Sequence, residues 1–130
     1  MKIAFNVSPL NNAKSSRGTG SYTNSLLLAL KKLADKDFQI IEFTNEVPKE
    51  TDIVHYPFFD PFFLTLPFFK TKKIIVTVHD LIPLVFTDQY KRGVRGEIKW
   101  QIQRQALKVT NGIITDSLNS KEDIIKIIDY

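Results

Sequence analysis

Residues 73–80 read Lys73-Ile74-Ile75-Val76-Thr77-Val78-His79-Asp80, a short β-branched run that ends in two polar side chains. An unbroken apolar run of this length is typical of a strand with both faces buried, as in a parallel sheet. Similar runs before and after this segment predict strands at residues 3–7, 38–44, 52–55 and 112–115. Because longer helical stretches separate several of these runs, we expect an α/β fold with an open, doubly wound parallel sheet of the Rossmann-like kind.

Three longer stretches predict the main helices. The first begins near Gly20 or Ser21, ends near Asp35, and carries Leu26, Leu27, Leu30 and Leu33 at helical spacing. The second covers residues 94–109, with an expected core stripe of Ile98, Ile102, Ala106 and Val109. The third follows a cap within residues 117–120, where Ser120 and Asp123 have the spacing of a capping box.

Residues 58–69 contain six phenylalanines and two prolines. Pro61 and Pro67 exclude a long helix or a central strand. A short helix over residues 60–66 is expected, with Asp60 as its N-cap and Pro61 at its first helical position. Most of the rings are expected in the core; an exposed remainder would suit an apolar acceptor, a sugar face or a bilayer edge.

Composition restricts the chemistry of the chain. Its 130 residues suit one domain, and a content of 43% hydrophobic and 25% charged residues is ordinary for a globular protein. Cysteine is absent and histidine occurs only twice, which excludes disulfides, thiolate catalysis and a cysteine- or histidine-rich metal site. No apolar run approaches the ~18–20 residues of a spanning helix. The chain opens on a strand pattern instead of a signal peptide, so we expect a cytoplasmic protein.

Positive charge is concentrated in one segment. Between Lys91 and Lys108, six basic residues accompany a single acid, Glu97, and this segment accounts for the whole net charge of +4. A solvated helix face is the simplest interpretation. An anionic membrane, an anionic substrate and a protein partner are the alternatives, and no nucleic-acid partner is expected.

The loop after the first strand contains the first group of candidate site residues. Gly18, Thr19 and Gly20 precede a helix whose free N–H groups favour an anion or a sugar hydroxyl, and Tyr22 follows them. A flexible loop that ends in a helix cap explains the same residues. Arginine side chains for a phosphate are available at Arg17, Arg92 and Arg95.

Two further strands end in candidate residues, because ligands of open parallel sheets bind beyond the carboxyl ends of the strands. His79 follows a buried strand, and its imidazole suits proton transfer near neutral pH; a structural histidine is the alternative. Asp80 would orient that ring or cap a turn. His55 and Tyr56 end the third strand beside the phenylalanines.

The segment after the last strand, Asp116-Ser117-Leu118-Asn119-Ser120, offers hydroxyl groups at the same edge. Ser117 would face the ligand or cap the last helix, whereas Ser120 is better explained as a cap.

Five motifs, taken in order, resemble the N-terminal domain of retaining GT-B glycosyltransferases of family 4. They are Ile3-Ala4-Phe5-Asn6-Val7-Ser8-Pro9-Leu10, Gly18-Thr19-Gly20-Ser21-Tyr22-Thr23, Asp52-Ile53-Val54-His55-Tyr56-Pro57, Val76-Thr77-Val78-His79-Asp80-Leu81-Ile82-Pro83 and Gly112-Ile113-Ile114-Thr115-Asp116-Ser117-Leu118-Asn119-Ser120. The resemblance covers essentially the whole chain. It looks closest to mannosyl- or rhamnosyl-transferase-like members that build bacterial surface polysaccharides.

The resemblance implies that residues 1–130 form the acceptor-side half of a GT-B fold, in which two Rossmann-like domains face each other across a cleft. The glycine segment Gly18–Gly20 would approach the donor phosphates or the acceptor, and His79 would lie near the transferred sugar. Transfer would retain the anomeric configuration and would need no metal. No other cofactor is expected, because the nucleotide sugar counts as a substrate. Ser21 departs from the family pattern, because relatives often have arginine there.

The domain that binds the nucleotide sugar is missing from this sequence, so little or no transfer is expected from the chain alone. The expected partners are that C-terminal domain, in cis or in trans, a glycan or lipid-linked acceptor, and an anionic membrane at the inner face. Two rival functions remain. One is a non-catalytic module that docks a partner domain through its aromatic and basic surface, and the other is a small nucleotide-binding protein of flavodoxin-like topology.

Overall fold

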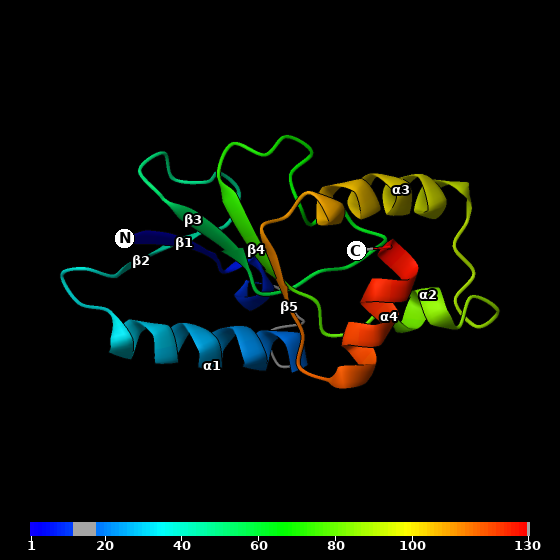
Figure 1. Cartoon of the computed structure of the whole chain (residues 1–130), viewed down its shortest axis with the longest axis horizontal. Coiled ribbons are helices and arrows are strands. Elements are labelled where there is room, and N and C mark those ends of the chain that lie inside the picture. The colour runs from blue at the N-terminus through cyan, green and yellow to red at the C-terminus, as the bar shows by residue number, and fades with distance from the viewer. Residues whose placement is uncertain (12–17, 130) are drawn as a thin grey trace.

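The computed structural model describes residues 1–11 and 18–129. In these residues five parallel strands form one sheet in the order β2-β1-β3-β4-β5, with helices against both faces (Figure 1). The strands are β1 (Lys2–Asn6), β2 (Gln39–Phe43), β3 (Ile53–Tyr56), β4 (Lys73–Thr77) and β5 (Gly112–Ile114). The helices are the 3₁₀ helix η1 (Ser8–Leu10), α1 (Gly18–Leu33), α2 (Ile82–Val85), α3 (Val94–Lys108) and α4 (Leu118–Ile128). The expected open, Rossmann-like α/β fold is confirmed.

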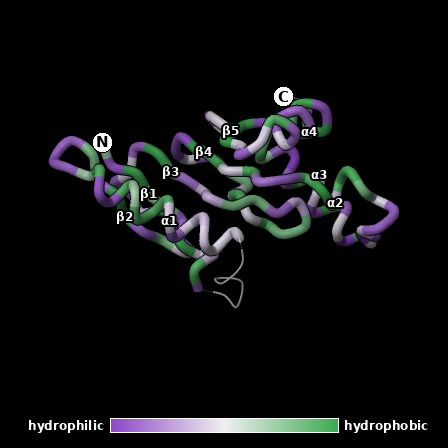
Figure 2. Tube along the Cα trace, turned by 90° about the horizontal axis from the view of Figure 1, so that it is seen from below, coloured by the Kyte–Doolittle hydropathy of each residue, from purple (hydrophilic) through white to green (hydrophobic). Residues whose placement is uncertain are grey.

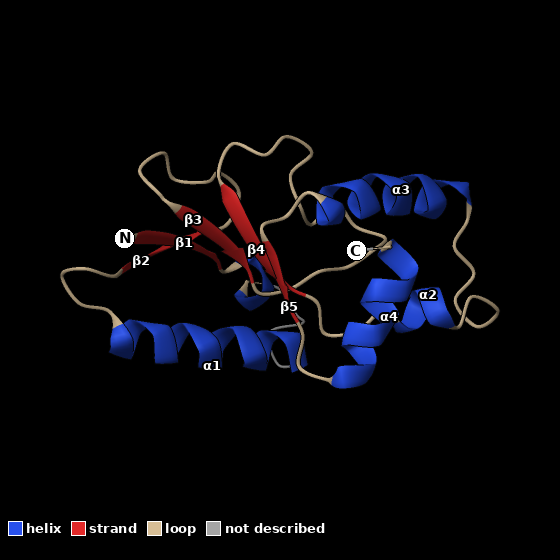
Figure 3. Cartoon of the chain, viewed as in Figure 1, coloured by secondary structure: helices blue, strands red, loops and turns tan. Residues whose placement is uncertain are grey.

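The sheet separates two hydrophobic layers. Because neighbouring residues of a strand point to opposite faces, Phe5 and Ala4 belong to different layers. Phe5 packs with Val7 and Leu27 of α1. Ala4 belongs to the larger layer, where α3 and α4 contribute Trp100, Leu107, Ile124 and Ile128. Figure 3 shows α1 and α3 on opposite sides of the strands.

The chain changes direction across the sheet after β2. From β1 it passes through α1 to β2 at one edge, then returns to the other side of β1 to form β3, β4 and β5. All carboxyl ends of the strands therefore lie at the same edge of the sheet. In open α/β folds, ligands bind at this edge near the point of reversal, which here lies between β1 and β3.

The core side of α3 differs from the predicted stripe. The helix buries Trp100, Gln103, Ala106 and Leu107. Ile98 and Val109, which were expected in the core, are 55% and 54% exposed. Two stripes at helical spacing competed, and the one with the larger ring of Trp100 and the fully buried Leu107 faces the sheet. Of the predicted stripe only Ala106 is fully buried.

The predicted helix over residues 60–66 is wrong, because the segment forms only a turn at residues 61–64. Side chains satisfy its backbone groups in place of helical hydrogen bonds. The Asp60 carboxylate accepts from the Phe62 N–H at 2.8 Å, and Gln103 binds both the N–H and the carbonyl of Leu66 at 2.8 and 3.2 Å. The segment thereby runs along α3 without becoming helical.

Two short features follow β4 and β5 at the carboxyl edge of the sheet. The unpredicted helix α2 lies in the loop after β4, with Pro83 in its first turn. Ser117, for which a ligand contact and a cap were the two alternatives, caps α4 and accepts from the Ser120 N–H at 3.1 Å. Ser120 itself lies inside α4, so the expected capping box of Ser120 and Asp123 is wrong.

Helices α2 and α3 and the turn between them lie at the end of the molecule opposite the N-terminus in both views (Figures 1 and 2). Figure 2 colours this end with alternating hydrophobic and hydrophilic segments. None of the helices in the described part of the chain combines the length and the apolar character needed to cross a bilayer.

Candidate functional site

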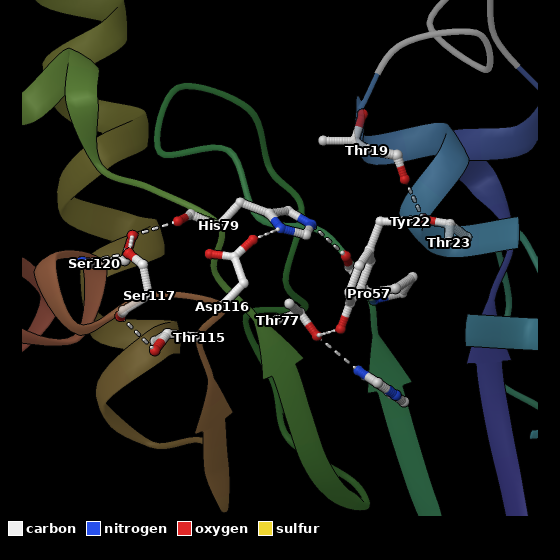
Figure 4. A network of polar contacts seen from close by, with 11 residues as sticks. Thr19, Tyr22, Thr23, Pro57, Thr77, His79, Thr115, Asp116, Ser117 and Ser120 are labelled. Atoms are coloured by element: carbon white, nitrogen blue, oxygen red, sulfur yellow. Dashed lines mark hydrogen bonds and ion pairs between the residues drawn. The ribbon is translucent and has the colours of Figure 1, made fainter. Parts of the chain in front are cut away.

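The parallel register of β4 and β5 brings His79 next to Asp116. Thr77 pairs with Ile114 across the two strands, and His79 and Asp116 each follow two residues later. Their side chains meet beyond the strand ends, with His79 Nδ1 2.9 Å from Asp116 Oδ2 (Figure 4). The imidazole is 17% exposed and the carboxylate 50%, so the pair lies at the surface of the crevice and not in the core.

Two other segments hold the His79 ring. His79 Nε2 lies 3.3 Å from the carbonyl oxygen of Pro57, which follows β3. The Tyr22 ring of α1 meets the imidazole edge-on, with 4.6 Å between centroids and 85° between planes. Both ring nitrogens thus face acceptors. A neutral imidazole can donate to one of them, whereas the imidazolium donates to both.

This geometry suits a proton-carrying or hydrogen-bonding imidazole whose orientation is fixed. A carboxylate that accepts from one ring nitrogen fixes the orientation and the tautomer of the ring. Pro57 occupies the other nitrogen at a long distance that a ligand hydroxyl or phosphate oxygen would improve upon. In this orientation Nε2 would face a ligand as an N–H donor when the ring is an imidazolium, and as a hydrogen-bond acceptor or base when the ring is neutral.

The first turn of α4 anchors the backbone of His79. The Ser120 hydroxyl donates to the His79 carbonyl at 2.6 Å, and the Ser117 hydroxyl donates to Ser120 Oγ at 2.8 Å. Since the Ser117 oxygen also caps α4, its proton and one of its lone pairs are used within the fold. The arrangement supports the capping interpretation of Ser117.

Asp80 makes a different contact from Asp116. Its carboxylate accepts from the Ile82 N–H at 3.1 Å and so stabilises the turn that begins α2. The turn-capping alternative for Asp80 describes this contact, and the carboxylate at the His79 ring is that of Asp116. In the segment that begins with Asp116, the predicted ligand groups were the serine hydroxyls alone. Counting register from adjacent strand ends would have found this partner.

His55 lies below the edge, inside the α1 layer. Its Nε2 is 3.0 Å from Thr77 Oγ1, and the Phe5 ring meets it edge-on. Burial lowers the pKa of His55 from 6.5 to about 4, so the ring is neutral near neutral pH. Tyr22 Oη is 3.4 Å from the same Thr77 hydroxyl, which connects the buried histidine to the residue that supports His79 (Figure 4).

A pocket of about 600 Å³ opens at the carboxyl ends of β1, β2 and β3. Its walls combine aromatic rings with hydroxyl and amide groups, including Phe43, Tyr56, Phe58, Asn6, Thr44 and Asn45. Asn6 is fixed there, since its amide donates to the Thr44 carbonyl at 3.1 Å and its oxygen accepts from the Ser8 N–H at 3.1 Å. Such a lining suits the face of a sugar ring together with its hydroxyls.

Tyr56, the last residue of β3, is a predicted site residue that lines this pocket. It is buried against Phe43, edge to face at 5.8 Å, and burial raises the pKa of its phenol. The Pro57–Phe58 segment separates the pocket from His79: the Pro57 carbonyl meets the imidazole, and Phe58 lines the pocket. The Pro57–Phe58 segment therefore contacts both parts of the candidate site, the His79 ring and the pocket.

The glycine segment contributes to the edge only in part. Thr19 lines the pocket, and its carbonyl accepts from the Thr23 hydroxyl at 2.7 Å. Gly18 begins α1 in open space, where a Cβ would meet nothing within 4 Å, and Gly20 is buried in the first turn. The preceding residues 12–17, with the phosphate candidate Arg17, lie outside the described residues.

The candidate site thus consists of two parts at one sheet edge, a histidine held by a carboxylate and an aromatic, hydroxyl-lined pocket. Within residues 1–11 and 18–129, no cluster of three or more histidine and carboxylate side chains could hold a metal ion. Comparison of the chain with models of protein families, with curated proteins and with solved structures finds no match.

Proposed function

We propose that this chain is the acceptor-side domain of a retaining glycosyltransferase, incomplete without a domain that binds the nucleotide sugar. The proposal rests on one observation above all: the His79–Asp116 pair and the aromatic, hydroxyl-lined pocket share the carboxyl edge of a Rossmann-like sheet. The resemblance of five ordered motifs to family 4 GT-B enzymes supports the same function. We place the enzyme in the cytoplasm, with polysaccharide biosynthesis as its process.

In this proposal the pocket holds the acceptor. Tyr56 and Phe58 stack on apolar ring faces, and Asn45 and Thr44 bind hydroxyls. The reacting hydroxyl reaches across the Pro57–Phe58 segment toward the His79 ring. The aromatic and polar lining explains why the pocket would prefer a sugar to a purely apolar molecule.

The transfer step forms one bond and breaks another at the anomeric carbon. The acceptor oxygen bonds to that carbon on the face from which the phosphate of the donor leaves, and the acceptor proton goes to the departing phosphate oxygen. His79, as an imidazolium, donates a hydrogen bond from Nε2 to the transferred sugar, while Asp116 accepts from Nδ1 and keeps the ring oriented. The donor phosphates are bound by the partner domain.

The test adds the C-terminal domain of a family 4 enzyme in trans and assays transfer over a panel of nucleotide sugars. His79→Ala is expected to lower kcat by about 10²- to 10³-fold, because it removes a hydrogen bond to the reacting sugar. Asp80→Asn is the matched control, since Asp80 contacts only its own turn, and it should retain wild-type kcat. Asn45→Ala should raise the KM for the acceptor with kcat unchanged.

Transfer that is equally fast in wild type and His79→Ala would exclude the role given to this ring. If no nucleotide sugar supports transfer, binding still discriminates. The chemical shifts of His79 and Tyr56 in nuclear magnetic resonance should respond to added acceptor-like glycosides, and a complete lack of response would remove the acceptor site.

A second candidate function has support from the strand order. The order β2-β1-β3-β4-β5 is also that of flavodoxin-like proteins, which bind a flavin or nucleotide at the reversal between β1 and β3. Calorimetric titration with flavin mononucleotide and with nucleotides separates the two proposals. Saturable binding by the chain alone would favour the flavodoxin-like function, and its absence would favour the glycosyltransferase domain.

A further inference from the structure

Gln103 is the polar exception on the buried side of α3. Its side chain is 0% exposed, and it lies between Trp100 and Leu107 at helical spacing on the side of the helix that faces the core. Glutamine is mostly exposed in folded proteins, and burial of a polar group is costly unless the group is hydrogen-bonded. Since an apolar residue would continue the stripe, the reason for the amide lies in what it binds.

Both ends of the Gln103 amide bind one residue of the segment after β3. The amide oxygen accepts from the Leu66 N–H at 2.8 Å, and the amide nitrogen donates to the Leu66 carbonyl at 3.2 Å. A neighbouring antiparallel strand would give a backbone the same pair of contacts. The two hydrogen bonds therefore fix the direction of the backbone at Leu66, which apolar packing, being non-directional, does not.

Leu66 belongs to a run of five residues, here named the pocket wall, that lines one part of the pocket. The run is Phe63, Leu64, Thr65, Leu66 and Pro67. Its backbone is hydrogen-bonded within the segment, because the Thr65 N–H donates to the Phe63 carbonyl at 2.9 Å and the Thr65 hydroxyl accepts from the Asp60 N–H at 3.2 Å. A wall that holds its own shape moves as a unit, so a directional contact at one of its residues sets the orientation of the whole.

Other contacts hold the segment without setting that orientation. The side chains of Phe59 and Leu66 are buried in the larger hydrophobic layer and keep the segment against the core. At the start of the segment, the Pro57 carbonyl lies 3.3 Å from His79 Nε2. The amide of Gln103 is thus the contact from α3 that gives the pocket wall its direction.

We propose that Gln103 is a positioning residue, which holds the pocket wall in the orientation that binds the acceptor. The inference rests on the proposed function of the pocket as the acceptor site. Gln103 is fully buried and acts on the ligand through Leu66. Because the segment meets His79 at its other end, loss of the amide should weaken binding of the acceptor and leave the reacting end in place.

Gln103→Met tests the amide, because methionine has a similar length and volume but cannot replace the two hydrogen bonds. In nuclear magnetic resonance titrations of the chain, this variant should raise the dissociation constant for methyl α-mannoside by at least about tenfold, since a site with loosened supporting contacts departs from its best geometry. Gln105→Met is the matched control, because Gln105 is an exposed residue of the same helix, and it should bind the glycoside as wild type does.

The assay of transfer in trans separates positioning from catalysis. Gln103→Met should raise the KM for the acceptor and leave kcat unchanged, whereas His79→Ala should lower kcat. A role in stability alone predicts a lower free energy of unfolding for Gln103→Met with an unchanged affinity of the folded chain. Circular dichroism spectra recorded under the titration conditions check that each variant is folded.

Gln103→Glu restores the contact only when the new carboxyl group is neutral. A neutral carboxyl accepts from the Leu66 N–H and donates its own proton to the Leu66 carbonyl, whereas a carboxylate has no proton to donate. Burial raises the pKa of a carboxyl group, so the affinity of this variant should match wild type at about pH 5 and fall progressively toward pH ~8. Wild type measured at the same pH values corrects for the titration of His55, His79 and Asp60, and the glycoside itself carries no charge.

The orientation of the pocket wall can be measured without a ligand. Residual dipolar couplings report the direction of each N–H bond relative to the rest of the molecule. In Gln103→Met the couplings of residues 63–66 should change together, while those of the five strands stay as in wild type. Gln105→Met should leave both sets unchanged.

Unchanged couplings of residues 63–66 in Gln103→Met would overturn the inference whether or not a glycoside binds. If wild type binds methyl α-mannoside and Gln103→Met binds it equally well, the inference also fails and the proposed acceptor site stands. If wild type binds no glycoside, the acceptor site fails, and the couplings alone decide whether Gln103 orients the wall. Should Gln103→Met not fold, Gln103→Glu replaces it, and an affinity that does not fall with rising pH contradicts the positioning role.

Discussion

His55 lies in β3 and His79 follows the neighbouring strand β4, yet their surroundings assign them to different tasks. His55 is enclosed by Phe5 and Thr77 inside the α1 layer, and burial holds its ring neutral. His79 stands two residues beyond the end of β4, where Asp116 and Pro57 hold its two nitrogens and part of the ring reaches solvent. A residue at the strand end can meet a ligand, whereas a residue inside the strand can only pack.

The two regions are connected. Tyr22 presents its ring edge to His79 and its hydroxyl to Thr77, and Thr77 in turn contacts His55. The buried region around His55 and Thr77 thus fixes the position of Tyr22, whose ring packs against His79. His55 therefore contributes to the site by stabilising the fold, and its removal should first lower the free energy of unfolding.

The sharpest test compares the stability of two alanine variants. His55→Ala should lower the free energy of unfolding by about 2–3 kcal/mol, because it leaves a cavity and removes the shorter of the two hydrogen-bond contacts of the Thr77 hydroxyl. His79→Ala should lower it by no more than about 1 kcal/mol, since its partners lie near solvent. Urea titrations of both variants measure this difference. Equal losses in the two variants would contradict the division between a buried and a ligand-facing histidine.

Acid should destabilise the fold through His55. Its pKa is about 4 in the folded chain against 6.5 for the free ring, so the unfolded chain binds the proton more tightly. The stability due to the neutral ring is complete above pH 6.5 and is lost as the pH falls toward 4. The full shift corresponds to about 3 kcal/mol.

His55→Gln is the informative variant for this pH dependence, because the amide can still bond Thr77 but does not titrate. Urea unfolding over the same pH range should show wild type losing stability relative to His55→Gln. A constant difference between the two proteins across that range would mean that burial does not hold His55 neutral.

Much of the fold was predictable because its signals are local. The run at residues 73–78 has the β-branched residues of a buried strand, and the observed β4 begins at its first residue and ends one residue earlier. The side of α3 that faces the sheet was not predictable from spacing alone. Ile98 and Trp100 both lie on helical stripes, and only packing against the sheet selects between them.

The site was predictable in its location and not in its partners. Strand ends correctly indicated where His79, Tyr56 and Thr19 would lie. The carboxylate at His79 depended on the register between β4 and β5, which joins residues 37 positions apart. Such a contact carries no local signal and is found only when the ends of the two strands are aligned, so the nearer Asp80 was the natural but different choice. The pocket likewise combines loops after three strands, so no single motif describes it.

The smallest expected effect concerns the anchor beneath His79. Ser117→Ala removes the cap of α4 and the donor to Ser120, and should lower the free energy of unfolding by about 1 kcal/mol. Because Ser120 still binds the His79 carbonyl, the ring should stay in place. Asn119→Ala is the control, because Asn119 lies two residues after Ser117 and is exposed. If Ser117→Ala instead shifts the His79 ring resonances as strongly as Asp116→Asn does, the cap belongs to the ligand-facing region and the boundary between the two regions must be redrawn.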